Sequence, residues 1–307
     1  MHRNYYMIKN KLKILKRSKN KYRLIHDFCS KPFIKVITKL YLRKNNLDEL
    51  PFNPATLKYE IDERNEIKEN SEVCIIYPVY FEQQNRFEKF YDLLKKYEAF
   101  SSEIKKKLFI TIVDDGSPFI LHNLLTELNL NITFLKIKEN IRWNSGGAKN
   151  LGACYTSCKK LIITDNDHFI PEETIKWAIS KNIKNKIFMF DRIKSTSESP
   201  CNIHPNSFLI SKSDYFLIHG YNEKYCGMYG DDIPFRIKLW NSGKQLLLTK
   251  HVIIVYDFNE TKNYIKNHYK RIVPIKLYLK LLKGEENFQK MLNFNWQLLY
   301  QNSFVEE

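Results

Sequence analysis

Apolar residues follow two different spacings along the chain. They form continuous runs at residues 73–77, 108–113, 132–137 and 161–164, which predict four short β-strands. Between these runs they recur at helical spacing, most clearly at Phe87, Phe90, Tyr91, Leu94 and Tyr97. Residues 119–128 and 147–160 also read as helices, and Pro171 begins another. This alternation predicts an α/β fold, a mostly parallel sheet with helices on both faces.

Polar clusters follow three of the predicted strands. They cover residues 78–82, 114–117 and 165–168. In a parallel sheet these strand ends share one edge, where ligands bind in open α/β folds. Three clusters on one edge indicate a binding site.

Asp165 and Asp167 are the most informative pair in these clusters. Carboxylates two residues apart on an extended chain point to the same side, so both can reach one divalent cation that grips a diphosphate. The alternative is a simple polar turn, because Asp and Asn favour turns through local hydrogen bonds. The other two clusters favour the cation site.

The charge of this 307-residue chain is uneven. Residues 1–46 hold fourteen Lys or Arg and one acid, so +13 of the net +16 lies there. Such a segment suits nucleic acid, an acidic glycan or an anionic membrane surface. Its apolar positions at near-helical spacing fit helices lying on a membrane, and a solvated helical appendage fits them equally.

The lengths of the apolar runs and the placing of the cysteines bear on cellular location and redox state. No apolar run approaches the roughly 20 residues that span a bilayer, and the N-terminus lacks the uncharged core of a signal peptide. We therefore expect a cytoplasmic protein, peripheral at a membrane if the basic segment binds one. The six scattered cysteines are expected to be reduced, and Cys154 and Cys158 to serve helix packing.

The same features divide the chain into segments. Residues 1–46 form the basic helical segment and 47–70 a connector with two prolines. The α/β domain is expected over 71–257. Residues 258–307, with interspersed basic, aromatic and Leu positions, are expected to form a helical extension.

The order of four motifs resembles the nucleotide-sugar half of family 2 glycosyltransferases with the GT-A (Rossmann-like) fold. The motifs are Ile-Ile-Tyr-Pro-Val-Tyr (75–80), Val-Asp-Asp-Gly-Ser (113–117), Ala-Lys-Asn-Leu-Gly (148–152) and Asp-Asn-Asp (165–167). The resemblance implies that Asp114 or Asp115 accepts a hydrogen bond from the base, which suits uracil. It places Pro78 and Tyr80 beside the base and Lys149 at the diphosphate. For each, a structural role is the alternative: a turn, a rim aromatic or a helix-surface lysine.

A second block resembles the acceptor side of galactosyltransferase-type enzymes. It contains Gly-Tyr-Asn-Glu (220–223), Met-Tyr-Gly-Asp-Asp (228–232) and a downstream Lys238. The resemblance implies that Asp232 is the catalytic base and that Asp231 takes the preceding Glu place. Met228, His219 and Pro234 depart from the pattern. The alternative is a helix N-terminus, with Pro234 in the first turn and Gly243 as the stop.

A further metal ligand, often a His, follows the next strand in the resembled family. Here Asp257 stands after the predicted strand 252–255, and His251 is a weaker candidate on its other side. A structural role is the alternative for Asp257.

The two resemblances imply that residues 71–257 form a catalytic domain, with a nucleotide-sugar half (71–170) and an acceptor half (171–257). Together these features predict a metal-dependent glycosyltransferase, and the resemblance implies that it inverts the configuration. It would use Mn²⁺ or Mg²⁺ and move a sugar from a nucleotide-diphosphate sugar, UDP-linked by preference, to a glycan or glycolipid hydroxyl. The rivals are a nucleic-acid-binding protein that uses the basic segment and an inactive homologue that only binds glycans. Acidic clusters on the ligand edge argue against the first rival, since they repel phosphate unless a cation fills them.

Overall fold

The computed structural model describes residues 72–118, 122–201, 204, 206–229, 231–256, 271–272 and 290–306. The chain divides into two compact units, Met1–Asn53 and Pro54–Glu307, and every described residue belongs to the second. The basic segment, the connector, Asp257 and most of the expected C-terminal extension lie outside the described residues.

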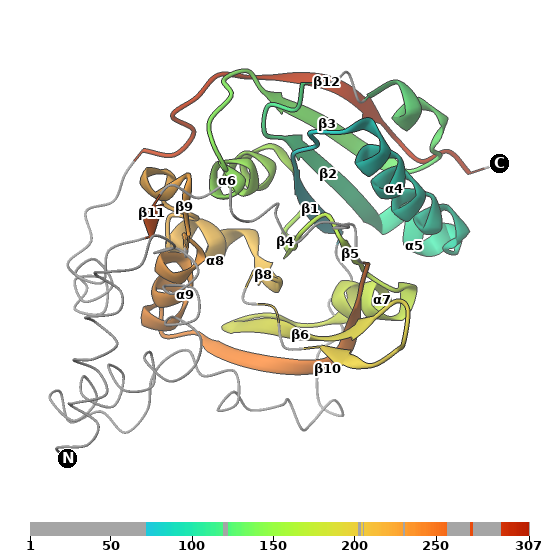
Figure 1. Cartoon of the computed structure of the whole chain (residues 1–307). Helices are drawn as coiled ribbons and strands as arrows, with labels where there is room; N and C mark the ends of the chain where they lie inside the picture. Colours follow the sequence, from blue (N-terminus) through green and yellow to red (C-terminus); the bar gives the residue numbers. More distant parts are fainter. Residues whose placement is uncertain are drawn as a thin grey trace, which may run out of the picture. The chain divides into compact units, whose positions relative to one another are not determined.

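The predicted parallel strands form one half of a large sheet (Figure 1). Their order is β3-β2-β1-β4, and every neighbouring pair among them is parallel. The bounds are β1 (Val73–Val79), β2 (Leu108–Asp114), β3 (Asn131–Ile137) and β4 (Lys160–Ile163). The continuous apolar runs are explained by burial of these strands on both faces.

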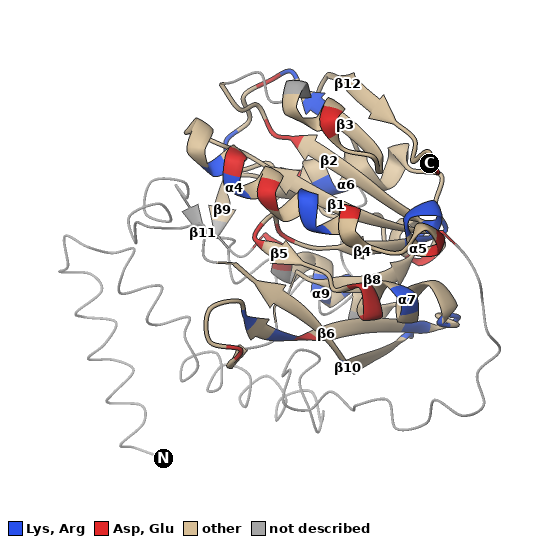
Figure 2. Cartoon of the chain, turned by 90° about the vertical axis from the view of Figure 1, so that its right-hand side faces the viewer, with Lys and Arg blue, Asp and Glu red and all other residues tan. Residues whose placement is uncertain are grey.

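Helices connect these strands close to the predicted positions. They are α4 (Gln84–Lys95), η2 (Lys96–Ala99), α5 (Ser102–Lys107), η3 (His122–Glu127) and α6 (Ser145–Tyr155), and α7 (Glu172–Ser180) follows Pro171 as expected. The short helix predicted over 119–128 is the 3₁₀ helix η3. In α5 Glu103 lies in the first turn and lysines in the last, seen in blue in Figure 2, an arrangement that complements the helix dipole.

The second half of the sheet makes the whole sheet mixed, which corrects the expectation of a mostly parallel one. From β4 the order continues β8-β6-β10-β5, with β7 beside β6. Only β6–β10 is parallel there, whereas β4–β8, β6–β8, β6–β7 and β5–β10 are antiparallel. The strands are β5 (His168–Phe169), β6 (Lys186–Lys194), β7 (Pro200–Cys201), β8 (Phe208–Ser211) and β10 (Gln245–Val255).

The described end of the chain is a strand, so the expectation of a helical extension is wrong for residues 296–302. Strand β12 (Trp296–Asn302) pairs antiparallel with β3 at the sheet edge, as Figure 1 shows. Within β12, Leu299 and Tyr300 pack against the core, whereas Trp296 and Leu298 are exposed, at 37% and 43%. A separate two-stranded sheet joins β9 (Met228–Tyr229) to β11 (Arg271–Ile272).

The two faces of β1 bury into different apolar clusters. Val73, Ile75 and Tyr77 join the cluster that includes residues of α4, α5 and α7. Cys74 and Ile76 join the cluster that includes Ala153 of α6 and residues of α8 (Lys212–Leu217) and α9 (Asp232–Asn241). Burial on both faces fixes β1 at the centre of the sheet and its carboxyl end at the edge where the polar clusters lie.

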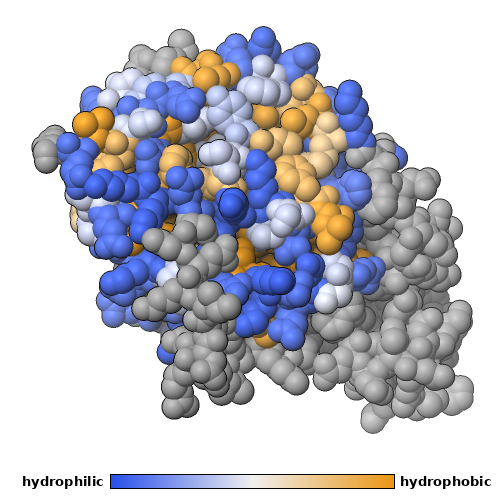
Figure 3. Space-filling model, turned by 180° about the vertical axis from the view of Figure 1, so that it is seen from behind, coloured by the Kyte–Doolittle hydropathy of each residue, from blue (hydrophilic) through white to orange (hydrophobic). Residues whose placement is uncertain are grey.

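The surface carries the ordinary mixture of side chains. The face seen in Figure 3 has apolar residues interspersed among hydrophilic ones, as folded proteins commonly do. The five cysteines in the described part of the chain carry free thiols. Among the described helices, none combines the length and hydropathy that a bilayer crossing requires.

Candidate active site

The carboxyl ends of β1, β2 and β4 bring the three polar clusters to one sheet edge, as predicted. Val79 lies opposite Asp114, and Ile76 lies opposite Ile163, the last residue of β4. The Asp115 amide donates to the Val79 carbonyl at 2.8 Å, which ties the first two strand ends together. The polar side chains beyond these ends therefore face a common space.

The structure separates the roles of Asp114 and Asp115. Asp114 Oδ1 accepts from the Ser117 amide at 2.8 Å, and its Oδ2 lies 3.0 Å from Lys136 Nζ, so this carboxylate builds the turn. Asp115 Oδ2 accepts from the Asn144 amide at 2.6 Å. Its Oδ1 is buried and has no hydrogen-bond partner among the described residues. Asp115 is therefore the better candidate to accept a hydrogen bond from a ligand.

Burial also changes the acidity at this turn. It raises the pKa of Asp115 well above its usual range, against the hydrogen bond from the Asn144 amide. Burial raises the pKa of Tyr80 as well, and the charges of Glu82, Asp115 and Asp114 add to it. Tyr80 adjoins this turn, because the Val79 carbonyl accepts from the Asp115 amide and the Phe81 amide donates to Ser117 Oγ. Its place beside a base stays a prediction. Pro78 is half-buried within β1, opposite Val113.

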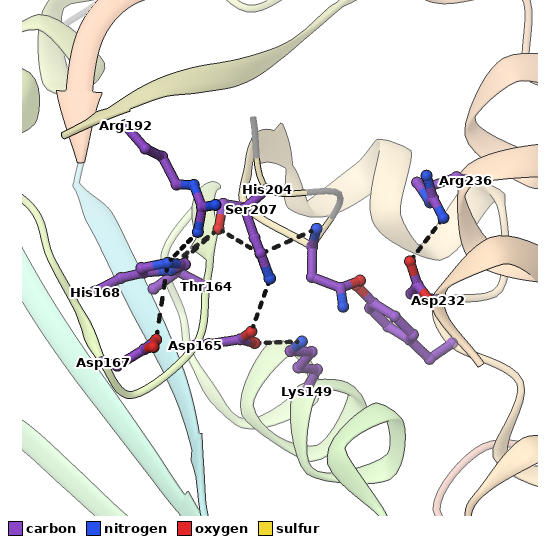
Figure 4. A network of polar contacts seen from close by, with 12 residues as sticks. Lys149, Thr164, Asp165, Asp167, His168, Arg192, His204, Ser207, Asp232 and Arg236 are labelled. Carbon is purple, nitrogen blue, oxygen red and sulfur yellow. Dashed lines mark hydrogen bonds and ion pairs between the residues drawn. The ribbon is translucent and has the colours of Figure 1, made fainter. Parts of the chain in front are cut away.

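Lys149 is a buried residue of α6 and not a helix-surface lysine. It is 1% exposed, and its Nζ lies 3.1 Å from Asp165 Oδ1. The same ammonium stands 5.3 Å from the centroid of the Tyr221 ring. A buried lysine needs a compensating charge, and Asp165 supplies it. The pair places one positive and one negative group next to each other at the sheet edge where the polar clusters lie (Figure 4).

Asp165 has a second partner, His204, which sequence reasoning did not identify. His204 Nε2 lies 3.3 Å from Asp165 Oδ2, and His204 Nδ1 accepts from the Asn206 amide at 3.3 Å. This places the proton of the neutral ring on Nε2, facing Asp165. Burial lowers the pKa of His204, against the attraction of Asp165. For Asp165, burial opposes ionisation, but Lys149 above all outweighs it and lowers its pKa.

His168 and Arg192 form a second polar group beside this one. His168 is 1% exposed, and its Nε2 lies 2.9 Å from an Arg192 nitrogen, which can only donate. Its Nδ1 lies 2.8 Å from Thr164 Oγ1, so the ring is neutral with the proton on Nδ1. Burial, then the charge of Arg192 among others, holds the pKa of His168 well below its usual value. The 3.8 Å approach to Asp167 Oδ1 is therefore no ion pair.

Asp165 and Asp167 lie on a turn, in which the His168 amide donates to the Asp165 carbonyl at 3.1 Å. The extended backbone from which their common direction was predicted is therefore absent at these residues, and the polar turn that was the alternative is present. Both side chains are about one third exposed, at 33% and 30%. No group of three or more His, Cys, Asp or Glu in the described residues could enclose a metal. Mg²⁺ commonly uses one or two carboxylates together with substrate phosphates, and carboxylates also suit Mn²⁺. Two partly exposed carboxylates would be enough for a cation shared with a diphosphate, and such a cation at Asp165 and Asp167 stays a prediction.

Buried tyrosines support the loop that carries these aspartates. Tyr77 donates to the His168 carbonyl at 2.6 Å, and its hydroxyl lies 2.7 Å from that of Tyr97. The Ile170 amide donates to the Tyr97 hydroxyl at 3.0 Å. These hydrogen bonds attach the backbone of residues 168–170, which follow Asp167, to β1 and η2.

The Gly220-Tyr221 turn is bound to α6 through Asn150, the residue after Lys149. Asn150 is fully buried; its Oδ1 accepts from the Tyr221 amide and the Tyr215 hydroxyl, and its Nδ2 donates to the Tyr221 carbonyl. Lys238 Nζ donates to the Gly220 carbonyl at 2.7 Å. The downstream basic residue of the resembled block thus braces this turn.

The two acidic residues at the start of α9 have different environments. Asp232 Oδ2 lies 2.8 Å from Arg236 one turn later, a pair that Figure 4 shows apart from the Asp165 group. Burial and the charge of Asp232 raise the pKa of Asp231 to about 8, against the attraction of Lys149. The helix begins and ends as predicted, with Gly243 at φ +70° after it. Asp231 is the N-cap residue of α9, but its side chain makes no capping hydrogen bond.

Two further residues, Gly147 and His251, have packing roles in the structure. A Cβ on Gly147 would lie 2.2 Å from Asn144 Oδ1, so close packing within the protein already requires this glycine. His251, the weaker metal candidate, stacks on Trp177 with ring centroids 4.6 Å apart. That contact explains His251 as a packing residue.

The comparisons with known proteins support the fold. Neither protein-family models nor curated protein sequences match this chain. The structure is similar to S. aureus TarS 1–349 in complex with UDP-GlcNAc, with a TM-score of 0.52, 12% identity, and 70% of this chain and 71% of that chain covered. Mannosyltransferase PcManGT from Pyrobaculum calidifontis, in complex with GDP-Man and Mn²⁺, matches with a TM-score of 0.47, 16% identity and coverage of 64% and 61%.

The fold conclusion rests on the TarS match, whose TM-score exceeds 0.5. It identifies a mixed α/β fold of the kind found in GT-A-like glycosyltransferases. At this low identity the likeness extends to the fold alone. The assignments to family 2 and to a galactosyltransferase-type acceptor block stay predictions.

Proposed function

We propose that this protein is a metal-dependent, inverting glycosyltransferase. It would move a sugar from a nucleotide-diphosphate sugar, with UDP-sugars favoured, to a hydroxyl of a glycan or glycoconjugate. One observation carries the proposal: the buried Lys149 pairs with the partly exposed Asp165 at the same sheet edge as Asp115, whose buried Oδ1 has no hydrogen-bond partner among the described residues. A buried acceptor without a partner costs about 1–3 kcal/mol, which a ligand donor would recover.

The donor would be held by its two ends. Asp115 Oδ1 would accept the imide N–H of a uracil, with Tyr80 and Pro78 beside the ring. Lys149 would contact the diphosphate, since its ammonium can exchange part of its contact with Asp165 for a phosphate oxygen. The cationic charge is buried and held in place, so little reorganisation is needed when the leaving group gains charge.

Asp165 and Asp167 would hold the divalent cation. When bound with the diphosphate, that cation acts as a Lewis acid on the departing oxygen. The protein would fix the direction of the Asp165 carboxylate, because Lys149 and His204 contact it, and the tyrosine hydroxyls hold the backbone that follows Asp167.

Asp232 would take the proton from the acceptor hydroxyl as this attacks the anomeric carbon, breaking its bond to the diphosphate oxygen. A single displacement from the opposite face inverts the configuration. Asp231, with a pKa of about 8, is protonated near pH 7 and cannot accept a proton there. Asp232 forms an ion pair with Arg236, so it is the available base of the two.

The test is a panel of sugar nucleotides with and without Mn²⁺, scored by release of nucleoside diphosphate. The proposal expects metal-dependent release with at least one donor. Asp232→Asn is expected to abolish transfer while donor binding, measured by calorimetry with Mn²⁺ present, stays within about twofold. Full turnover in that variant would remove Asp232 as the base, and no release with any donor would remove the proposed activity.

A further inference from the structure

Two carboxylates bind the backbone that precedes β12. Glu223 accepts from the Leu292 amide at 2.9 Å and from the Asn293 amide and side chain at 3.0 and 3.1 Å. Glu139 accepts from the Asn295 amide and side chain, the latter at 2.7 Å. The segment 290–302, which we call the C-terminal strap, is thus attached at two points before it enters the sheet as β12 (Figure 1).

Of these two carboxylates, only Glu223 has a recorded hydrogen bond to α6 among the described residues, whereas the backbone of Glu139 lies beside Gly116 of the Asp115 turn. Glu223 Oε1 also accepts from Asn150 Nδ2 at 2.8 Å. Asn150 follows Lys149 on α6 and bonds both the amide and the carbonyl of Tyr221. Glu223 therefore joins the strap to the helix that carries Lys149 and to the turn that carries Tyr221, whose ring the Lys149 ammonium approaches.

Apolar contacts follow the same path. Leu292 and Phe294 of the strap pack against the cluster that includes Ala148 and Leu151 of α6. Met291 packs against the cluster that includes Tyr221 and Phe235, whose rings stack 4.1 Å apart. The strap thus covers the apolar supports of both α6 and the Tyr221 turn.

We infer that the C-terminal strap holds Lys149 and Tyr221 in position for donor binding and that Glu223 is the positioning residue that couples them. The inference rests on the proposed function for its catalytic readout. Glu223 touches none of the groups placed at the reacting atoms. Glu223 positions Lys149 and Tyr221 because its carboxylate accepts hydrogen bonds both from Asn150 of α6 and from Leu292 and Asn293 of the strap. Hydrogen bonds to a charged acceptor are stronger than those between neutral groups.

The substitution Glu223→Gln tests this coupling. Gln has the same shape, but only one of its two end atoms accepts. Either the bonds at Oε1, from Leu292 and Asn150, or those at Oε2, from Asn293, must therefore be lost, and the strap loses at least one bond in both cases. Glu139→Gln is the matched control. It makes the same change at the other attachment of the strap, which has no recorded bond to Asn150 or Tyr221 in the described structure.

Both variants are made in the full chain, with hydrogen exchange and steady-state kinetics as readouts. Glu223→Gln is expected to speed exchange in the strap, α6 and residues 220–225, and to raise the donor KM roughly tenfold, as loss of one charge-assisted bond would. Glu139→Gln is expected to speed exchange in the strap alone and to leave KM and kcat within about twofold. Unchanged donor KM in Glu223→Gln, or equal KM changes in both variants, would overturn the inference.

Asn293→Ala covers the case in which Glu223→Gln does not fold. It removes the side-chain bond to Glu223 from the strap and leaves Glu223–Asn150 in place. Faster strap exchange with a raised donor KM supports the inference, and faster strap exchange with an unchanged KM overturns it. If the parent protein shows no activity on any sugar nucleotide, the proposed function fails. Exchange in α6 and residues 220–225 then still decides whether Glu223 couples the strap to them.

Discussion

The chain offers two buried lysines whose comparison separates catalysis from stability. Lys149 and Lys160 are both 1% exposed. Lys149 pairs with Asp165 at the ligand edge, whereas Lys160 Nζ donates to the carbonyls of Ala178, Ile179 and Lys181 at 2.6–3.1 Å, at the end of α7. Replacing each by Met keeps the length of the side chain and removes the charge.

The expected magnitudes differ because the partners differ. In Lys149→Met, Asp165 keeps His204 and is one third exposed, so it is not left as a stranded buried charge. We therefore expect the free energy of unfolding to change by about 1 kcal/mol or less, well below the 3–5 kcal/mol typical of a broken buried pair. Loss of a preorganised electrostatic group at the leaving oxygen should lower kcat about 10²–10³-fold.

Lys160→Met should behave in the opposite way. It leaves three helix-end carbonyls without their donor, and we expect a loss of about 2–4 kcal/mol in the free energy of unfolding. Its kcat should match the parent protein, because its Nζ bonds are made at the end of α7 and not at the ligand edge.

Urea unfolding and steady-state release of nucleoside diphosphate measure both effects on the same samples. A Lys149→Met variant that turns over at the parent rate would refute the assigned role of Lys149. A loss of more than about 3 kcal/mol in that variant would refute the argument that Asp165 remains compensated.

Three other predictions follow from the site. Asp115→Ala should raise the Kd for UDP about 10- to 100-fold, the value of one hydrogen bond to a charged group, and calorimetry showing an unchanged Kd would contradict the base-binding role. Asp231 has a folded pKa of about 8, above its usual 3.8, so its contribution to stability is full below about pH 4 and is lost as pH rises to about 8. When urea unfolding is measured across that pH range, the free energy of unfolding should fall less steeply with pH in Asp231→Asn than in the parent protein. An equal slope in both proteins would contradict the raised pKa of Asp231. Tyr97→Phe breaks the bonds to Tyr77 and to the Ile170 amide and should cost about 1–3 kcal/mol, which urea unfolding would detect.

The sequence determined much of the nucleotide half. The first four strands, α6, α7 and α9 lie close to their predicted positions, because continuous apolar runs and helical spacing are local signals that burial on both faces strongly selects. The gathering of residues 114–117 and 165–168 at one edge was predicted from parallel strand order, whereas Lys149, which lies on α6, was identified by the family resemblance. The strands at residues 186–194 and 208–211 carry apolar runs too, but their antiparallel pairing depends on partners far along the chain.

Only the tertiary structure decided which partner each polar residue of the candidate site contacts. The sequence presents Asp114 and Asp115 as equals, and only the distant Lys136 and Asn144 make one a turn residue and the other a candidate ligand contact. His204 reaches Asp165 across 39 residues, and β12 reaches β3 across more than 150, with no spacing in the sequence to announce either contact. Local periodicity fixes which residues form an element and which side they bury, whereas the partner of each polar group is set by where the packed elements bring the chain back together.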